Sequence, residues 1–165
     1  MSITSEQFRN ALRHYPAGVT IVTIKTTTDE KPHGLTVSAF TSLSPEPPLI
    51  MVAIDNRGTG HEMMQKEGTV FAVNILPQDK MDLSNRFAWV KDDDRFADGD
   101  WGTAVTGAPI LNDALAWLDC TMYAQFPAGT HTIYVGHVQA SAVPRPDDLP
   151  LLYWNRGYRQ LKVND

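Results

Sequence analysis

Residues Gly34–Asp55 read GLTVSAFTSLSPEPPLIMVAID, and this stretch decides the predicted fold because it holds two different strand patterns. In its first half, apolar residues alternate with small hydroxyl residues, and Phe40 is the exception. The apolar set is Leu35, Val37, Ala39 and Leu43, and the hydroxyl set is Thr36, Ser38, Ser42 and Ser44. Successive side chains of a strand point to opposite faces, so one face is predicted to pack and the other to offer hydroxyls.

The second half of the stretch changes from alternation to a continuous apolar run. Leu49–Ile54 contains no polar residue and is bounded by Pro48 and Asp55. Such a run is typical of a strand that is buried on both faces, as inside a closed barrel. The prolines that precede the run end the strand before it.

The segment before this stretch predicts one helix and one strand. Apolar residues three or four apart form the helix face: Phe8, Ala11, Leu12 and Tyr15. Thr4 and Gln7 fit a capping box, which starts the helix near Ser5. The β-branched residues from Val19 onward predict a strand, and the turn-forming DEKPHG joins it to the opening stretch as a hairpin.

The segments that follow alternate between strands and short helices. A second capping box, Thr59 with Glu62, predicts a helix that opens at Gly60, whose free backbone N–H groups suit an anion. Residues 69–76 predict a strand, and residues 77–90 predict a helix. Its shared face would consist of Leu83, Phe87 and Val90. Residues 91–102 are expected to form a solvated loop.

The last third of the chain is mostly strand. Residues 114–126 and 131–143 are β-patterned runs joined by a short turn, and residues 149–154 lead into another turn and Tyr158. Strands outnumber helices, and short turns join most neighbours. The chain therefore predicts one mainly β domain over residues 1–165, a small antiparallel barrel with flanking short helices.

Composition excludes several classes of function. The 165-residue chain carries 19 acidic and 14 basic residues, a net charge of −5, so we expect no nucleic-acid partner. Its longest apolar run is far shorter than the roughly 20 residues that span a bilayer, so we expect no membrane contact. Cys120 is the only cysteine and no signal-peptide pattern precedes the first helix. We expect a cytoplasmic protein in which Cys120 is an inert core thiol.

Several catalytic motifs fail on spacing. GTGHEM, from Gly58, lacks the third glycine of a dinucleotide-binding loop, and HEMMQ lacks the second histidine of a zinc-protease helix. His131 and His137 share a strand face but lie about 20 Å apart, too far to share a metal ion. What remains is a set of neutral donors beside a helix start, which suits a flat anionic cofactor and no metal.

Together, seven segments resemble the short-chain flavin reductase family, whose members supply reduced flavin to two-component monooxygenases. They are FRNALRHYPAGVTIVT, HGLTVSAFTSLSPEPPLIMV, FAVNIL, GAPIL, LDC, GTHTIYVGHV and LLYWNRGYR. They occur in the family's order over nearly the whole chain. The resemblance implies an antiparallel split β-barrel of the FMN-binding type that forms a homodimer, binds FMN or FAD, and takes hydride from NADH or NADPH.

The resemblance also implies a set of cofactor-binding residues. The isoalloxazine ring would meet Thr36, Val37, Ser38 and Ala39, and Ser42 would lie nearer the ribityl and phosphate end. The phosphate side would be held by Asp55, Asn56, Thr59 and Gly60. Arg57 is a further candidate for a phosphate contact, which the family pattern does not require. The same groove would be lined by Asn74 and Ser84, Phe87 would help cover the flavin, and Tyr158 would lie near the ring at the dimer boundary.

For catalysis, the resemblance implies that His131 borders the nicotinamide. Thr130 stands just before it, where many family members carry an aspartate. Taken singly, the hydroxyls on the strand, Asn74, His131 and Tyr158 also fit purely structural roles.

The leading interpretation is an NAD(P)H:flavin oxidoreductase that passes hydride to a diffusible flavin for a partner monooxygenase. A non-catalytic flavin carrier is the second interpretation, because a fold does not decide function. A pyridoxamine-phosphate oxidase-like enzyme is the third, and it is favoured less because only Arg57 and Lys66 would bind phosphate.

Overall fold

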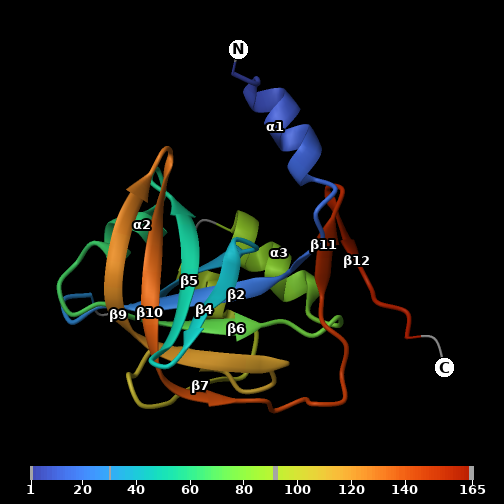
Figure 1. Ribbon diagram of the computed structural model, residues 1–165. Coiled ribbons are helices and arrows are strands. Elements are labelled where there is room, and N and C mark those ends of the chain that lie inside the picture. The colour runs from blue at the N-terminus through green and yellow to red at the C-terminus, as the bar shows by residue number, and fades with distance from the viewer. Residues whose placement is uncertain (1, 30, 91–92, 164–165) are drawn as a thin grey trace.

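A seven-stranded antiparallel sheet dominates the computed structural model, which describes residues 2–29, 31–90 and 93–163 (Figure 1). Its strands are β2 (Thr20–Lys25), β3 (His33–Val37), β4 (Phe40–Pro45), β5 (Pro48–Asp55), β6 (Val70–Ile75), β9 (Ala116–Ala128) and β10 (His131–Ala142). They are ordered β3-β2-β6-β9-β10-β5-β4 across the sheet. The prediction of a mainly β, antiparallel domain is confirmed.

Smaller elements surround this sheet. A three-stranded sheet consists of β1 (Ala17–Gly18), β11 (Leu152–Trp154) and β12 (Gly157–Arg159), and a two-stranded sheet consists of β7 (Trp101–Thr103) and β8 (Pro109–Leu111). The helices are α1 (Ser5–Leu12), α2 (Thr59–Met64), α3 (Met81–Trp89) and the 3₁₀-helix η1 (Asp93–Ala97). Within the described residues, no helix is long and apolar enough to cross a membrane.

The two edges of the large sheet are joined by a sharp corner in the chain. β3 and β4 are the opposite edge strands, yet only Ser38 and Ala39 lie between them. Two residues span about 7 Å, so the sheet must curl until its edges approach. At this corner the Ala53 N–H donates to the Ala39 carbonyl at 2.9 Å. The single alternating strand expected over residues 34–44 is therefore two strands. Before the corner β3 pairs with β2, and after it β4 pairs with β5.

Apolar side chains fill the inside of the curled sheet. Val22, Val52, Phe71 and Tyr134 belong to this core and are fully buried. Phe71 also explains Gly136, since a Cβ at that position would lie 2.5 Å from its ring. A second core lies between the sheet and α3. It includes Ile21, Leu76, Leu83, Phe87 and Leu111.

One prediction about burial is wrong. β5 is not buried on both faces: its residues alternate, and the buried ones are Ile50, Val52 and Ile54. The other face of β5 lies on the outside of the sheet. The helix before Pro16 forms as α1 with its Thr4–Gln7 capping box, but none of its residues is buried. Phe8 is 51% and Tyr15 74% exposed, because α1 projects away from the sheet (Figure 1).

Two local predictions also need correction. α2 begins at Thr59, with Gly58 as its N-cap and no side-chain capping bond, so Thr59 and Glu62 do not form the expected capping box. The expected loop contains η1, whose Phe96 ring packs edge-on against Phe87 at 5.1 Å. Through the Phe96 ring, this segment packs against the second core. Residues 91–92 of that loop lie outside the described residues.

Candidate functional site

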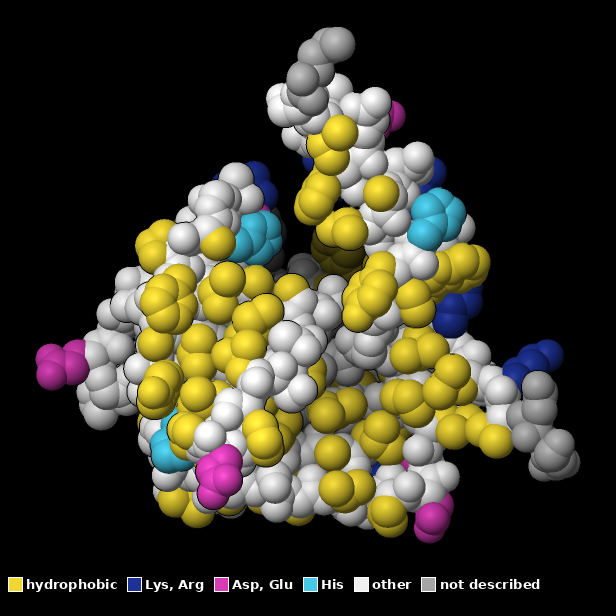
Figure 2. All heavy atoms as spheres, in the orientation of Figure 1, with side chains coloured by type: hydrophobic (Ala, Val, Ile, Leu, Met, Phe, Trp, Pro, Cys, Tyr) yellow, Lys and Arg dark blue, Asp and Glu magenta, His cyan; other side chains and the backbone are white. Residues whose placement is uncertain are grey.

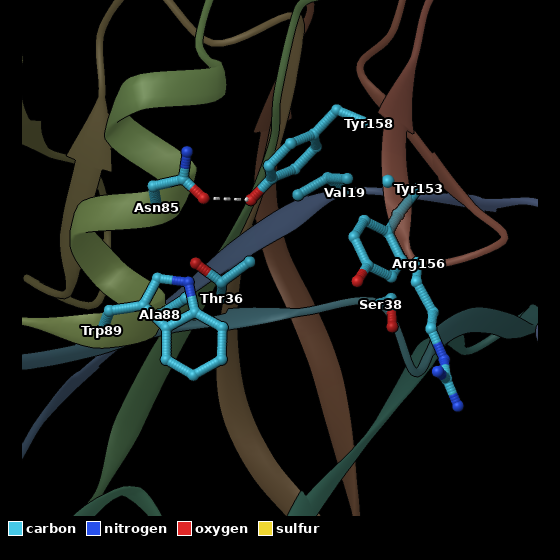
Figure 3. A pocket seen from close by; sticks show the side chains of 10 residues that line it. Val19, Thr36, Ser38, Asn85, Ala88, Trp89, Tyr153, Arg156 and Tyr158 are labelled. Atoms are coloured by element: carbon cyan, nitrogen blue, oxygen red, sulfur yellow. Dashed lines mark hydrogen bonds between the residues drawn. The ribbon is translucent and has the colours of Figure 1, made fainter. Parts of the chain in front are cut away.

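A cavity of about 320 Å³, here called the slot, opens between α3, the end of β3 and the β11–β12 hairpin (Figure 3). Its walls combine aromatic rings with hydroxyl and amide groups. The lining residues are Val19, Thr36, Ser38, Asn85, Ala88, Trp89, Tyr153, Arg156, Gly157 and Tyr158. The slot thus forms where the chain turns the corner from β3 to β4.

Tyr158 is held in the slot by hydrogen bonds to α3. Its hydroxyl lies 3.1 Å from the Asn85 Oδ1 and 2.9 Å from the Ser84 Oγ (Figure 3 shows the first). The ring also packs edge-on against Tyr153, with centroids 5.5 Å apart. The Thr36 Oγ1 donates to the Ser84 carbonyl at 2.6 Å. Ser84 therefore fixes both Tyr158 and Thr36 from beneath the slot.

A glycine allows α3 to approach β3 closely enough for these bonds. A Cβ on Gly34 would lie 2.4 Å from the Phe87 ring, which is shorter than any real contact. Phe87 is itself almost fully buried. A side chain at Gly34 would push α3 outward and pull Ser84 away from Thr36.

A second cavity, of about 720 Å³, adjoins the slot, and Ala88 and Trp89 line both. On its far side it reaches Arg57 and the start of α2, including Thr59 and Gly60. α2 is anchored to the core by Tyr134, whose hydroxyl lies 2.6 Å from His61 Nδ1 and accepts from Gln65 at 2.7 Å.

Charged groups around the second cavity are ordered by short contacts. Arg57 donates to both carboxylate oxygens of Asp55, at 3.0 and 2.6 Å. These bonds, with one from the Arg57 backbone N–H, hold the pKa of Asp55 well below its usual range. Arg95 donates to the Gly34 carbonyl at 2.5 Å and lies beside His33. Burial, with the charge of Arg95, lowers the pKa of His33 to about 4, so this histidine is neutral at pH 7.

The structure brings several predicted site residues together. Thr36, Ser38 and Tyr158 line the slot, whereas Thr59, Gly60 and Phe87 line the second cavity. Ala39 lies next to the slot, in a groove of about 470 Å³ between the corner and α1. Figure 2 shows a hollow between α1 and the body of the molecule.

Other predicted residues lie outside both cavities. Val37 is buried in the sheet core, and Ser84 is buried beneath the slot. Ser42 is exposed on β4, and Asn56 accepts a bond from Thr132 at 2.8 Å. Asp55 is next to the second cavity through its pairing with Arg57 but does not line it.

Asn74 and His131 are the two clearest departures. Asn74 is fully buried in β6 and bonds the backbone of β2 and β8, so the structure does not bring it to the groove. These contacts fit the purely structural role that the sequence also allowed for Asn74. His131 is exposed at the start of β10, opposite Asp55, and its Nδ1 lies 3.0 Å from the Thr130 Oγ1. It lines neither cavity.

Sequence reasoning identified only three of the ten residues that line the slot: Thr36, Ser38 and Tyr158. Asn85, Ala88 and Trp89 come from the face of α3 opposite to its apolar face, with helical spacing. A tryptophan outside the apolar face of the predicted helix was an available signal, and the structure leaves Trp89 78% exposed. Tyr153 and Arg156 come from the hairpin around the turn NRG. They line the slot because this hairpin lies opposite α3.

The slot fits a flat, conjugated ring with polar edges. Tyr158, Tyr153 and Trp89 offer aromatic surface, and Thr36 and Ser38 offer hydroxyls along one side (Figure 3). Aromatic walls with a few placed polar groups are the usual features of a cofactor site. The residues present therefore fit the isoalloxazine ring of a flavin.

The sequence matches the model of the flavin reductase like domain over residues 12–162. The chain is 39% identical over 154 residues to the reductase component of an FADH(2)-dependent resorcinol hydroxylase from Rhizobium sp. (strain MTP-10005), covering 93% of this chain and 85% of that protein. It is 35% identical over 162 residues to an NADH-dependent flavin reductase from Rhodococcus sp., covering 98% and 89%.

Solved structures agree with this match. The NADH:FAD oxidoreductase SgcE6 of Streptomyces globisporus C-1027, in complex with NAD and FAD fragments, superimposes with a TM-score of 0.87 and 27% identity. The match covers 98% of both chains. The chain belongs to the flavin reductase family of oxidoreductases, which confirms the resemblance seen in the sequence.

Proposed function

We propose that this protein is an NAD(P)H-dependent flavin reductase that reduces a diffusible FMN or FAD and supplies it to a partner monooxygenase. The observation that carries the proposal is the slot, a flat aromatic site with hydroxyl edges in a chain of this family. The similarity to the reductase component of a resorcinol hydroxylase supports a two-component system.

The chemistry comes from the cofactors: a nicotinamide gives a hydride that a flavin accepts. The protein has to stack and orient the two rings, and this needs no general base. Thr36 and Ser38 would meet the polar edge of the flavin, with the Ala39 backbone beside them. The bond from Thr36 to the Ser84 carbonyl sets the position of its side chain. Tyr158, fixed by Asn85 and Ser84, would border the ring.

The phosphate end of the flavin would lie in the second cavity. Arg57 and the backbone at Thr59 and Gly60 line that cavity and suit an anion. Asp55 orients the Arg57 guanidinium, and Phe87 forms part of the wall. Ser42 and Asn56 would contact the flavin only where it extends beyond the two cavities.

His131 is our candidate for the nicotinamide side. It begins β10 opposite Asp55, two residues along β5 from Ala53, which bonds the corner at Ala39. His131 thus lies beside Asp55 and lines neither cavity. It would orient a nicotinamide that lies over the flavin and reaches past the corner.

The proposal includes a homodimer in the cytoplasm. The apolar face of α1 is exposed, including Phe8 and Leu12, and further apolar side chains cover the outside of the large sheet (Figure 2). Exposed apolar surface of this kind marks an interaction site. The cytoplasm would supply the reduced nicotinamide and keep the free thiol of Cys120 reduced.

Steady-state loss of absorbance at 340 nm tests the function. NADH and NADPH would each be combined with FMN, FAD and riboflavin, and we expect a rate that rises and saturates with added flavin. No oxidation with any pair, together with tight stoichiometric flavin binding, would instead indicate a flavin carrier. The same experiment ranks the two nicotinamides and the three flavins.

A further inference from the structure

Arg156 occupies an unfavourable position in the turn between β11 and β12. The strands pair Trp154 with Gly157, which leaves a two-residue turn of Asn155 and Arg156. Both turn residues have positive φ, 49° and 63°. A turn of this kind favours Asn followed by Gly, because a Cβ is strained at the second position. An arginine there indicates that its side chain is used.

The guanidinium of Arg156 has no hydrogen bond or ion pair within the described part of the chain. Arg57 and Arg145, in contrast, pair with carboxylates at 2.6 and 3.0 Å. Arg156 lines both the slot and the groove beneath α1. Figure 3 shows its side chain extending past Ser38, on the side of the slot away from Trp89. It is an exposed, unpaired cation at the mouth of the slot.

An unpaired arginine fork at a binding site suits a phosphate group, and both substrates of the proposed reaction carry phosphate. The flavin phosphate has a different site, because Arg57 and the start of α2 line the second cavity. That cavity meets the slot only at Ala88 and Trp89, and Arg156 does not line it. The two cations therefore lie at opposite ends of the site, and Arg156 is free for the second substrate.

We propose that Arg156 binds the pyrophosphate of the nicotinamide dinucleotide and so determines the affinity for the hydride donor. This inference rests on the proposed function. Arg156 holds the part of the donor that does not react, while the nicotinamide ring enters the slot over the flavin. The loss of Arg156 should therefore weaken donor binding and leave hydride transfer intact.

The test compares Arg156→Gln and Arg156→Lys with Arg159→Gln. Arg159 is on the same hairpin, stacks over Trp154 and does not line the slot, so it controls for damage to the hairpin. We expect Arg156→Gln to raise the KM for NADH about tenfold with kcat and the flavin KM unchanged. Arg156→Lys should recover part of the loss, and Arg159→Gln should behave as wild type.

A hydride donor without phosphate, 1-benzyl-1,4-dihydronicotinamide, separates binding from chemistry. Wild type and Arg156→Gln should have equal kcat/KM with this donor. An unchanged KM for NADH in Arg156→Gln would overturn the proposal. So would a raised KM for FMN with an unchanged KM for riboflavin, which would assign Arg156 to the flavin phosphate. If wild type does not oxidise NADH with FMN, FAD or riboflavin, the proposed function itself fails, and that outcome is distinct from an unchanged KM in Arg156→Gln.

Discussion

Two polar clusters of this protein look alike in the sequence and differ in the structure. One surrounds Asn74 inside the sheet. Its amide donates to the Ile21 carbonyl at 3.2 Å and to Thr23 at 3.4 Å, and its Oδ1 accepts from the Leu111 N–H at 2.8 Å. Asn74 and Thr23 are fully buried. Every polar atom of the Asn74 amide is therefore used to hold β2, β6 and β8 together.

The other cluster lines the slot, where polar groups are left unused. Ser38 and Arg156 make no hydrogen bond within the described residues, and both are exposed at its mouth. Thr36, Asn85 and Tyr158 are tied down by hydrogen bonds that fix their direction. A buried polar group must be satisfied by the protein, whereas a binding site keeps groups available for its ligand. The cluster around Asn74 therefore supports the fold, whereas the slot keeps polar groups available to bind a ligand.

The largest expected effect comes from breaking the satisfied cluster. Asn74→Ala removes three hydrogen bonds and leaves the Leu111 N–H and the Ile21 carbonyl buried without their partner. We expect the free energy of unfolding to fall by about 3 kcal/mol. Urea denaturation followed by tryptophan fluorescence measures this loss. The KM for flavin in the folded fraction should stay near the wild-type value.

Ser38→Ala is the matched change in the slot. Ser38 is exposed, so its loss should alter the free energy of unfolding by less than about 0.5 kcal/mol, while the flavin KM rises. The reverse pattern would break the comparison: a raised flavin KM in Asn74→Ala at full stability would return Asn74 to the flavin site.

The fold could be predicted from the sequence wherever one pattern fixed one element. The β2–β3 and β9–β10 hairpins, α3 and the strand before the last turn follow from strand or helix periodicity with turn residues between them. The corner at Ser38 and Ala39 could not be predicted, because its only sign is the break in alternation at Phe40, and one residue out of phase also fits a single continuous strand. Which strand pairs with which is a long-range property, and only the curl of the sheet divides this stretch into two edges.

The site was predictable to a smaller extent, for the same reason. Thr36, Ser38 and Tyr158 were found through the family resemblance, and the slot places them together. Trp89 and Arg156 were missed, because their contribution depends on α3 and the hairpin facing each other across the corner. The family resemblance implied that Asn74 lines the groove, and the sequence does not show that its amide is already satisfied within the sheet.

A pH titration tests His33, a half-buried polar group at the edge of the second cavity. Burial and Arg95 lower its pKa to about 4 in the folded state, against about 6.5 when unfolded. Its contribution to stability is full above pH 6.5 and is lost as the pH falls toward 4, since only the unfolded chain is readily protonated. Allowing for its partial exposure, we expect a loss of about 1–2 kcal/mol over this range.

His33→Gln should flatten this part of the curve. Urea denaturation at intervals between pH 7 and pH 4, on wild type and variant, gives the comparison. If the free energy of unfolding changes equally with pH in both proteins, His33 remains accessible to protons. It then belongs with the open site and not with the buried cluster.

A further prediction concerns Tyr158, which belongs to both kinds of cluster because it lines the slot and bonds the buried Ser84. Tyr158→Phe keeps the ring and removes the bonds to Asn85 and Ser84. We expect about a fivefold higher flavin KM, since the ring is no longer fixed, with a stability loss of about 1 kcal/mol.

Tyr153→Phe is the control, because the Tyr153 hydroxyl makes no hydrogen bond within the described residues while its ring packs against Tyr158 at 5.5 Å. Steady-state kinetics and urea denaturation of both variants separate the two roles. If Tyr158→Phe loses stability at an unchanged flavin KM, the hydroxyl only supports α3, and Tyr158 joins Asn74 on the structural side. A raised flavin KM in Tyr158→Phe alone would show that the bonds from α3 hold the ring for its ligand.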